Sequence, residues 1–340
     1  MAIFKKTPKQ AEENSFAKIN RVKPLTNALL SMFFIIMAIC TVVPVLLVVS
    51  ISISSSESLA FNGFAWIPFS RTAETAALKA GASELAAWWE GFRSSITFSA
   101  YEGLFKTGSQ LVDCYKVTII TTAVHTVLSV LTMAAFAFVL AQQRFSGKKF
   151  YSIYLLIPML FSGGMVPSYI INVNYLHLYD SFWILVLPGM VNTFNVIVLR
   201  TFIQSTIPVE MFDAAAIDGA NEFRVFRSIV LPLSKAGLAT IALFVMVGKW
   251  NEWFTGMLYI DNPKLVPVQT MLTRIQQKLD FIKNNSDYAS TPDGQRLLMS
   301  MPTEQTRMAI LVVSTVPIIF AYPFFQRFFI QGLTIGSVKG

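Results

Sequence analysis

The most constraining feature of this sequence is an apolar run over residues 27–53 that contains no ionisable side chain. The hydrocarbon layer of a bilayer is about 30 Å thick, and a helix crosses it with about 20 apolar residues. Five more apolar runs follow, at 117–141, 150–171, 181–202, 236–259 and 308–325. We therefore predict an all-α integral membrane protein with six transmembrane helices, TM1 to TM6.

The composition supports this class. Charged residues make up 14% of the chain and hydrophobic residues 54%, whereas a soluble protein carries about 25% charged residues to cover its surface. This balance excludes an ordinary cytosolic enzyme and a disordered protein. With only two cysteines, the chain is not a disulfide-stapled secreted scaffold. The net charge of +8 on so apolar a chain favours a membrane over a nucleic acid as the partner.

Three of the runs depart from a plain apolar span of about 20 residues. The first is much longer than the 7–15 apolar residues of a cleavable signal peptide, so we favour an uncleaved anchor over that alternative. The fifth is interrupted by Lys249 and Glu252, and the sixth contains Pro317 and Pro323. Proline is tolerated in a membrane helix because packed neighbours satisfy the freed carbonyls.

Lys and Arg in short loops predict the orientation of the chain. The 1–26 segment holds six of them, and segments 142–149 and 205–235 also carry several, whereas the short loop 172–180 has none. We therefore place both termini, 1–26 and 326–340, in the cytoplasm together with 205–235. The two long loops, 54–116 and 260–307, are then extracytoplasmic.

The first long loop mixes Trp66, Trp88, Trp89 and Phe92 with acidic and small residues. Tryptophan prefers the membrane interface, so we expect short helices that rest on the outer membrane surface, including one over 84–92. A structural cap over the spans and a docking surface for an extracytoplasmic partner are both open.

The second long loop begins with a turn signal at 261–263. The sequence then predicts a helix over 268–281, followed by a polar segment at 283–294. A structureless segment of this length usually indicates a functional or mobile loop.

Few residues point to catalysis. There is no Gly-x-x-x-x-Gly-Lys-Ser/Thr loop for nucleotide phosphates, and Cys40 and Cys114 lack metal-ligand spacing. His125 and His177 lie far apart in the sequence. We expect His125 to be a packed intramembrane residue bonded to a neighbouring helix. The alternative, a proton relay, usually needs acidic companions that its span does not have.

The segment 207–233 carries the most information. Pro208 suits the first position of a helix, and Glu210 and Asp213 lie favourably near its N-terminus. Gly219 fits the left-handed position that ends a helix. Asn221 can cap a second short helix.

We expect Pro232 to stop that second helix, which gives a helix–turn–helix at the cytoplasmic face. The alanines 214–216 have strong helix propensity and give the exposed side a smooth, small surface, with Ala215 on the docking face. A mere connector is the alternative, but a connector does not need about 27 ordered residues.

This stretch resembles the EAA loop of binding-protein-dependent ABC importer permeases, whose core reads Glu-Ala-Ala-x-x-x-Gly-Ala with Leu-Pro downstream. The match covers residues 213–220 and then 231–232. The variant Ile-Asp-Gly-Ala at 217–220, Trp-Asn-Glu at 250–252 and the tail 332–340 are similar to the sugar-importer, MalG-like branch. Asp213 departs from the usual Glu and has a reach one methylene shorter. The resemblance covers roughly 20–340, apart from the enlarged first outer loop.

The resemblance implies the type I ABC importer permease fold and a set of partners. The EAA helix would dock on a dimer of separate ATPase subunits, which would bind the ATP and Mg, with no cofactor held by this chain. A second, MalF-like permease, an extracytoplasmic sugar-binding protein and membrane lipid would be the other partners, and no nucleic acid is expected. The C-terminal tail would reach toward the ATPase interface. The coupling residues that the resemblance implies are Glu210, Asp213, Ala214, Ala215, Ala216, Asp218, Gly219 and Ala220.

The resemblance also assigns a role to the second outer loop, which in related permeases acts as a scoop that displaces sugar from the binding protein. The matching residues are Asn284, Asn285, Asp287 and Tyr288, within the polar segment 283–294.

Lys249 and Glu252 lie three residues apart and can partly neutralise each other on one helical face. An intramembrane charge is costly, so each should face the bundle interior or a polar cavity. We expect Glu252, Asn251 and Lys249 to lie near the translocation path or its gate. A structural pair near the interface is the alternative.

The predicted function is the permease subunit of an ATP-driven sugar or oligosaccharide importer, itself without enzymatic activity. A secondary transporter would usually show paired repeats with broken helices, and none is visible. A membrane-embedded enzyme would need clustered acids or a His/Asp pair within the spans. The sequence does not identify the sugar.

Overall fold

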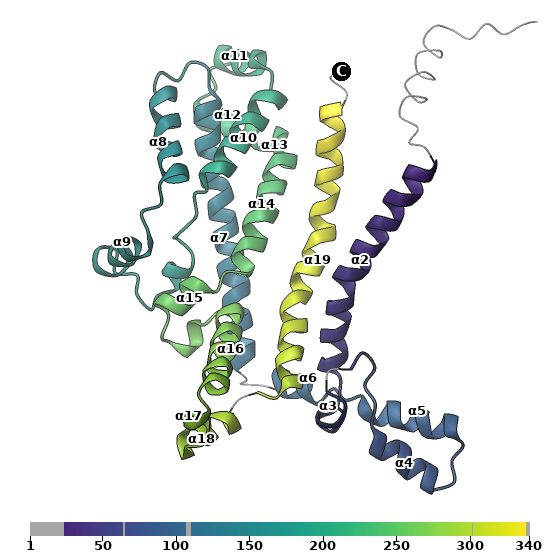
Figure 1. Cartoon of the computed structure of the whole chain (residues 1–340). Coiled ribbons are helices and arrows are strands. Elements are labelled where there is room, and N and C mark those ends of the chain that lie inside the picture. Colours follow the sequence, from purple (N-terminus) through teal and green to yellow (C-terminus); the bar gives the residue numbers. More distant parts are fainter. Residues whose placement is uncertain (1–23, 64, 107–109, 301, 338–340) are drawn as a thin grey trace, which may run out of the picture. The chain divides into compact units, whose positions relative to one another are not determined.

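The computed structural model describes residues 24–63, 65–106, 110–300 and 302–337 of the chain. Helices dominate this part (Figure 1). Its only extended pairing is an isolated antiparallel bridge between Ser54 and Ile96. The chain divides into two compact units, Met1–Ile96 and Thr97–Gly340.

The first unit begins with the long apolar helix α2 (Pro24–Ser52), which matches the predicted span 27–53. Three short helices follow: α3 (Ser56–Asn62), α4 (Arg71–Lys79) and α5 (Glu84–Ser95). Ser55, Ser70 and Ser83 cap them, each with a side-chain oxygen that accepts a hydrogen bond from a backbone amide of the first turn. The prediction of short helices in this loop is therefore confirmed, and their place on the membrane surface stays a prediction.

The second unit is built around α7 (Gln110–Ala141), which packs against α10 (Thr193–Thr206) and α14 (Lys235–Trp250). Helix α14 also packs against α19 (Glu304–Ser337). The remaining helices of this unit are α6 (Ser99–Phe105), α8 (Lys148–Leu160), α9 (Met165–Ile170), α11 (Val209–Ile217), α12 (Glu222–Val225), α13 (Leu231–Leu233), α15 (Phe254–Tyr259), α16 (Val268–Asn284), α17 (Ser286–Ala289) and α18 (Pro292–Ser300).

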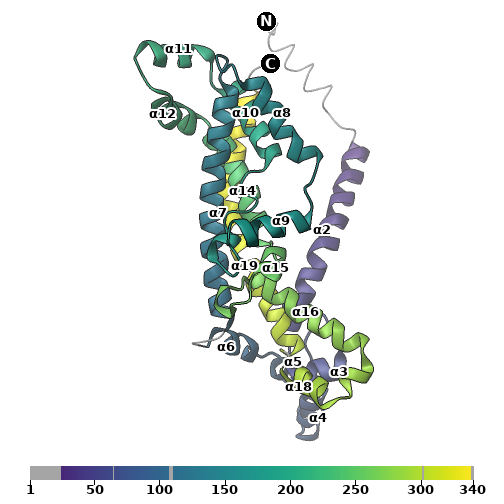
Figure 2. The same cartoon turned by 90° about the vertical axis from the view of Figure 1, so that its left-hand side faces the viewer.

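Two groups of these shorter helices lie at opposite ends of α7. Both views place α11 and α12 at one end and α16 to α18 toward the other (Figure 1, Figure 2). Short turns of other helix types complete the unit: the π-helices η1 (Ile171–Tyr175) and η3 (Phe226–Val230), and the 3₁₀ turns η2 (Phe182–Leu185) and η4 (Pro263–Leu265).

Three described helices are long and apolar enough to cross a membrane: Leu25–Ser52, Gln110–Ala141 and Glu304–Phe325. Two bent pairs pass the same test together. They are Lys148–Leu160 with Met165–Tyr175, bent by 111°, and Glu222–Leu233 with Lys235–Trp250, bent by 81°. Length and composition thus give three to five spans, so the predicted six remain a prediction.

The continuous helix predicted over 181–202 is wrong. The chain there forms the short turn η2 and then irregular backbone as far as Asn192, where α10 begins. Pro188 has no amide hydrogen to donate, Gly189 adopts a positive φ of 75°, and the side chain of Asn192 caps α10 by accepting from Asn195 N at 3.1 Å. With 14 residues, α10 rises only about 21 Å.

Two other predicted helices are interrupted. The run 150–171 breaks after Leu160, before Gly164 with its φ of 85°. The run 236–259 is divided at residues 251–253 into α14 and α15. At both breaks, polar residues or glycines stand inside an apolar stretch. The average hydropathy of the stretch stays high, so it does not reveal the break.

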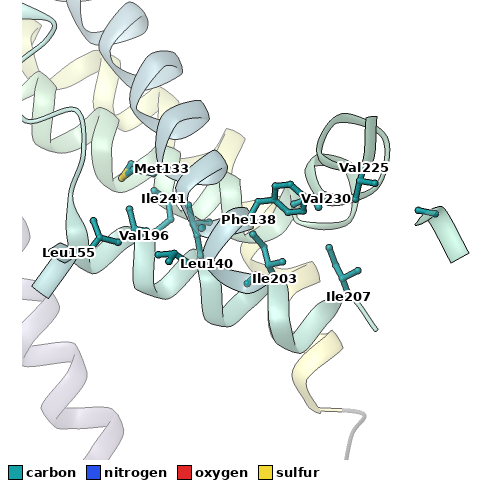
Figure 3. Packing of buried hydrophobic residues seen from close by; sticks show 14 residues of the cluster. Met133, Phe138, Leu140, Leu155, Val196, Ile203, Ile207, Val225, Val230 and Ile241 are labelled. Carbon is teal, nitrogen blue, oxygen red and sulfur yellow. The ribbon is translucent and has the colours of Figure 1, made fainter. Parts of the chain in front are cut away.

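Two clusters of buried apolar residues hold the second unit together. The first joins α7, α8, α10 and α14 to the helices α11 and α12, with Phe138 and Ile203 among its members (Figure 3). The second joins α6, α7, η2, α15, α16 and α19 around Leu185, Val268 and Ile310. The two clusters thus support the α11–α12 group and the α15–α16 group respectively.

Candidate functional site

The helix–turn–helix at α11 and α12 forms largely as the sequence predicts. Pro208 stands immediately before α11, with φ −61° and ψ 146°. Gly219 has a φ of 72°, the left-handed conformation that suits glycine after a helix. Asn221 Oδ1 accepts a hydrogen bond from Arg224 N at 2.9 Å, and such a cap contributes about 1 kcal/mol.

The expectation that Pro232 stops the second helix is wrong. The backbone continues helically from α12 through η3 and α13, and Pro232 lies in the first turn of α13. The chain turns only after Leu233, where Ser234 separates α13 from α14 and the direction changes by 81°.

The buried side of α11 and α12 anchors them on the spans. Ala215 and Val225 belong to the buried cluster that includes Phe138 of α7 and Ile203 of α10. The Phe138 ring also packs against that of Phe212, with centroids 6.4 Å apart. Ala215 therefore faces inward, and its expected position on the docking face is wrong.

The sequence predicts a smooth exposed side made of small residues, and this expectation is wrong. Ile217 is 87% exposed and Phe223 is 71% exposed. Ala214, Gly219 and Glu210 are also exposed. We call Met211, Ala214, Ile217 and Phe223 the apolar coupling surface.

Polar contacts join α11 and α12 to the loop between α7 and α8. Arg144 Nη2 lies 2.9 Å from Asp213 Oδ1, and Gln142 Nε2 donates to Glu222 Oε2 at 3.2 Å. Both partners of the ion pair are at least half exposed, so it contributes about 0.2–1 kcal/mol. A cavity of about 660 Å³ lies beneath these contacts, between the 141–145 loop, α10 and α11.

The three predicted gate residues lie together where α14 ends. Lys249 Nζ is 3.4 Å from Glu252 Oε2, and their side chains are 10% and 27% exposed. Glu252 Oε1 also accepts from Thr255 N at 2.7 Å, so Glu252 caps α15. Asn251 is exposed, and its Nδ2 donates back to Val247 O at 2.9 Å. All three thus take part in the break between α14 and α15.

The predicted scoop residues lie at the far end of α16. The expectation of a structureless segment at 283–294 is wrong, because α17 and the first three residues of α18 fall within it. Asn284 is the last residue of α16, and Asn285 Nδ2 donates to Phe281 O at 2.8 Å. Asp287 is exposed. The Tyr288 ring packs edge-on against Phe281, with centroids 5.3 Å apart.

His125 is a packed residue, as predicted. Its Nδ1 lies 2.6 Å from Val186 O. A carbonyl only accepts, so Nδ1 carries the hydrogen and Nε2 faces Ser129 Oγ at 3.4 Å. His125 thereby ties α7 to the irregular backbone after η2. Within the described ranges, no group of three or more His, Cys, Asp or Glu could hold a metal ion.

Arg144, Ile217 and Phe223 are not among the predicted site residues. The signal for Ile217 was available, since Met211, Ala214 and Ile217 recur every third residue and so share one helical face. Arg144 and Phe223 gave no such signal, because their positions depend on contacts between segments distant in the sequence.

These features define a helical membrane protein whose helix–turn–helix presents apolar side chains outside its long helices. Residues 117–335 match the family model described as the binding-protein-dependent transport system inner membrane component. The chain belongs to this family. The match confirms the resemblance drawn from the EAA loop and favours an importer permease over a secondary transporter or a membrane-embedded enzyme.

Individual relatives agree. Protein LplC of Bacillus subtilis is 37% identical over 250 residues, which cover 73% of this chain and 81% of LplC. The polygalacturonan/rhamnogalacturonan transport system permease protein YtcP of the same organism is 32% identical over 309 residues, or 91% of this chain and 96% of YtcP. A chain of a bacterial ABC transporter involved in import of the acidic polysaccharide alginate superposes with a TM-score of 0.70 at 25% identity, covering 90% of this chain and 96% of that one.

Proposed function

We propose that this chain is one of two permease subunits in an importer of sugars or oligosaccharides, and that a dimer of separate ATPase subunits drives it through α11 and α12. The observation that carries the proposal is the apolar coupling surface. Ile217 and Phe223 are large apolar side chains that are mostly exposed, and exposed apolar patches on ordered structure mark interaction sites.

The attachment of α11 and α12 suits the transmission of force. Ala215 and Val225 are buried in the same cluster as residues of α7, α10 and α14. A displacement of this helix pair must therefore move the long helices, because a closely packed core is hard to compress. The contacts of Arg144 and Gln142 add the α7–α8 loop to the same unit.

The chain itself would hold no cofactor and perform no catalysis. ATP and Mg would bind to the ATPase subunits, and the second permease and an extracytoplasmic sugar-binding protein would complete the assembly. We place both termini in the cytoplasm and extend the proposal to six spans. The sixth span would be formed by the broken segment from η2 to α10, in addition to the five formed by α2, α7, α8–η1, α14 and α19.

The substrate class rests on the relatives. YtcP is named for polygalacturonan and rhamnogalacturonan, AraQ of Halalkalibacterium halodurans for arabinooligosaccharides, and the superposed structure for alginate. Because several of these are polymers or oligomers of sugars, we propose an oligosaccharide as the cargo of this chain.

The test of coupling is the exchange of Ile217 for Asp. A charge at the centre of an apolar contact should reduce the ATPase copurified with a tagged chain by at least about tenfold. Leu85 of α5 is similarly exposed, at 81%, and Leu85→Asp is the matched control that should leave copurification unchanged. Equal recovery of ATPase with both variants would refute the docking role of α11.

The cargo is tested separately, by uptake of labelled oligogalacturonides, arabinooligosaccharides and trehalose in cells with and without this chain. Loss of uptake of at least one oligosaccharide in the deletion, restored by the chain, supports the proposal. Uptake of all three that does not depend on the chain would refute the proposed substrate class while leaving the coupling role intact.

A further inference from the structure

The short helix α15 lies unusually close to the first turns of α16. A Cβ added to Gly256 would fall 2.2 Å from Thr270 Oγ1 and 3.0 Å from Pro267 Cδ, so only glycine permits this approach. Thr270 Oγ1 in turn donates to Trp253 O at 3.0 Å. The N-terminal half of α15 is therefore held directly against α16.

Arg274 holds the other end of α15. From the second turn of α16, its Nη2 donates to Gly256 O at 3.2 Å and also to Ile260 O. These are carbonyls of the last turn of α15 and its C-cap, which lack partners within a helix and attract a cation. The side chain is half-buried, and none of the ion pairs found in the described ranges involves Arg274.

The partners of Arg274 are thus backbone atoms, which indicates that it fixes the orientation of α15 rather than neutralising a carboxylate. An arginine suits this task because its planar guanidinium donates in several fixed directions. A lysine would carry its three donors on one freely rotating nitrogen, without the fixed planar arrangement.

Helices α15 and α16 both contact other elements of the second unit. At its start, α15 is capped by Glu252, which also pairs with Lys249 at the end of α14. At its start, α16 is anchored on α7, where Val268 N donates to Thr118 Oγ1 at 2.9 Å. At its far end, α16 contacts α17 through the rings of Phe281 and Tyr288.

We propose that Arg274 is a positioning residue that joins α15 to α16, so that a displacement of α16 to α18 is carried into α15 and reaches the Lys249–Glu252 pair. This inference rests on the proposed function, and it extends that proposal by letting the outer segment α16–α18, which includes the predicted scoop residues, receive the binding protein. Without the guanidinium, α16 can move while α15 stays in place, and the outer face is uncoupled from the end of α14.

The test uses the complete transporter, purified through a tag on this chain and placed in lipid nanodiscs. Hydrogen exchange of α15 and α16 is measured before and after the ATPase is trapped with ATP and vanadate. In the wild type, both helices should change protection together. In Arg274→Met, α15 should exchange at least about tenfold faster before trapping, because bonds to a charged donor are lost, and its response to trapping should disappear while that of α16 remains.

The matched control is Lys278→Met, an exposed position one turn further along α16, which should behave as the wild type. Arg274→Lys keeps the charge but should restore the protection of α15 only in part, and it carries the test if the methionine variant fails to reach the membrane.

Joint responses of α15 and α16 in both Arg274 variants, with exchange as slow as in the wild type, would overturn the inference. A wild-type complex that contains no ATPase, or does not respond to trapping, would instead refute the proposed function, and this inference with it.

Discussion

Replacing Gly256 by alanine tests how closely α15 is packed on α16. The added methyl group would meet Thr270 Oγ1 at 2.2 Å and both Pro267 Cδ and Thr270 Cβ at 3.0 Å. Overpacking of this kind costs about 1–3 kcal/mol. Moving the threonine aside also breaks its hydrogen bond to Trp253 O, which costs about 1 kcal/mol.

Alanine in place of glycine within a helix raises the free energy of unfolding by about 1 kcal/mol, because alanine has the higher helix propensity. The net expected effect of Gly256→Ala is therefore a loss of about 1–3 kcal/mol in the free energy of unfolding. The measurement is unfolding of the purified chain by sodium dodecyl sulfate in mixed micelles. The control is Gly248→Ala in α14, where an added Cβ has nothing within 4 Å and stability should hold or rise slightly.

A double-mutant cycle identifies the cause of this loss. Thr270→Ala removes the oxygen nearest to the new methyl group, so the cost of Gly256→Ala should be clearly smaller in that background. If Gly256→Ala is as stable as the wild type, or costs the same with and without Thr270, the close packing of these two helices does not hold.

Three further predictions concern orientation, coupling and the gate. In a cysteine-free background, Ser146→Cys and Asn284→Cys should label oppositely with an impermeant thiol reagent, and labelling of Ser146→Cys in intact cells would overturn the topology. Gly219→Val strains a left-handed residue by about 1–2 kcal/mol, so it should leave membrane levels normal but reduce copurified ATPase; full transport would place coupling elsewhere. Glu252→Gln leaves Lys249 without its carboxylate, which should cost about 3 kcal/mol and alter transport or basal ATP hydrolysis; unchanged values of both would refute a role at the gate.

The local features of α11 and α12 were predictable because short-range chemistry determines them. A glycine after an alanine-rich helix favours a left-handed turn, and an asparagine before the next helix favours an N-cap. Gly219 and Asn221 adopt this turn and this cap. The burial of Ala215 was not predictable in the same way. It depends on residues such as Phe138, which approach from α7, far away in the sequence.

The interrupted helices show a different limit. Pro188, Gly189 and Asn192 stand within an apolar run, and hydropathy averages over them although they determine the backbone. Conversely, residues 283–294 are polar enough to suggest a loop, yet Tyr288 packs on Phe281, and Gly294 is buried where α18 begins. The composition of a segment thus indicates whether it lies in an apolar or a polar environment better than it indicates whether the segment is helical.

The bond between His125 and Val186 has a consequence for how this chain is made. A bilayer offers no hydrogen bonds to irregular backbone, so such a segment persists at membrane depth only where protein shelters it. The segment between η2 and α10 is synthesised after α7. His125 of α7 is therefore already available to donate a hydrogen bond to the carbonyl of Val186. We expect the broken segment to be retained beside the translocon until α7 receives it, so that His125→Phe would delay membrane integration of α10 during synthesis, before any effect on the finished transporter.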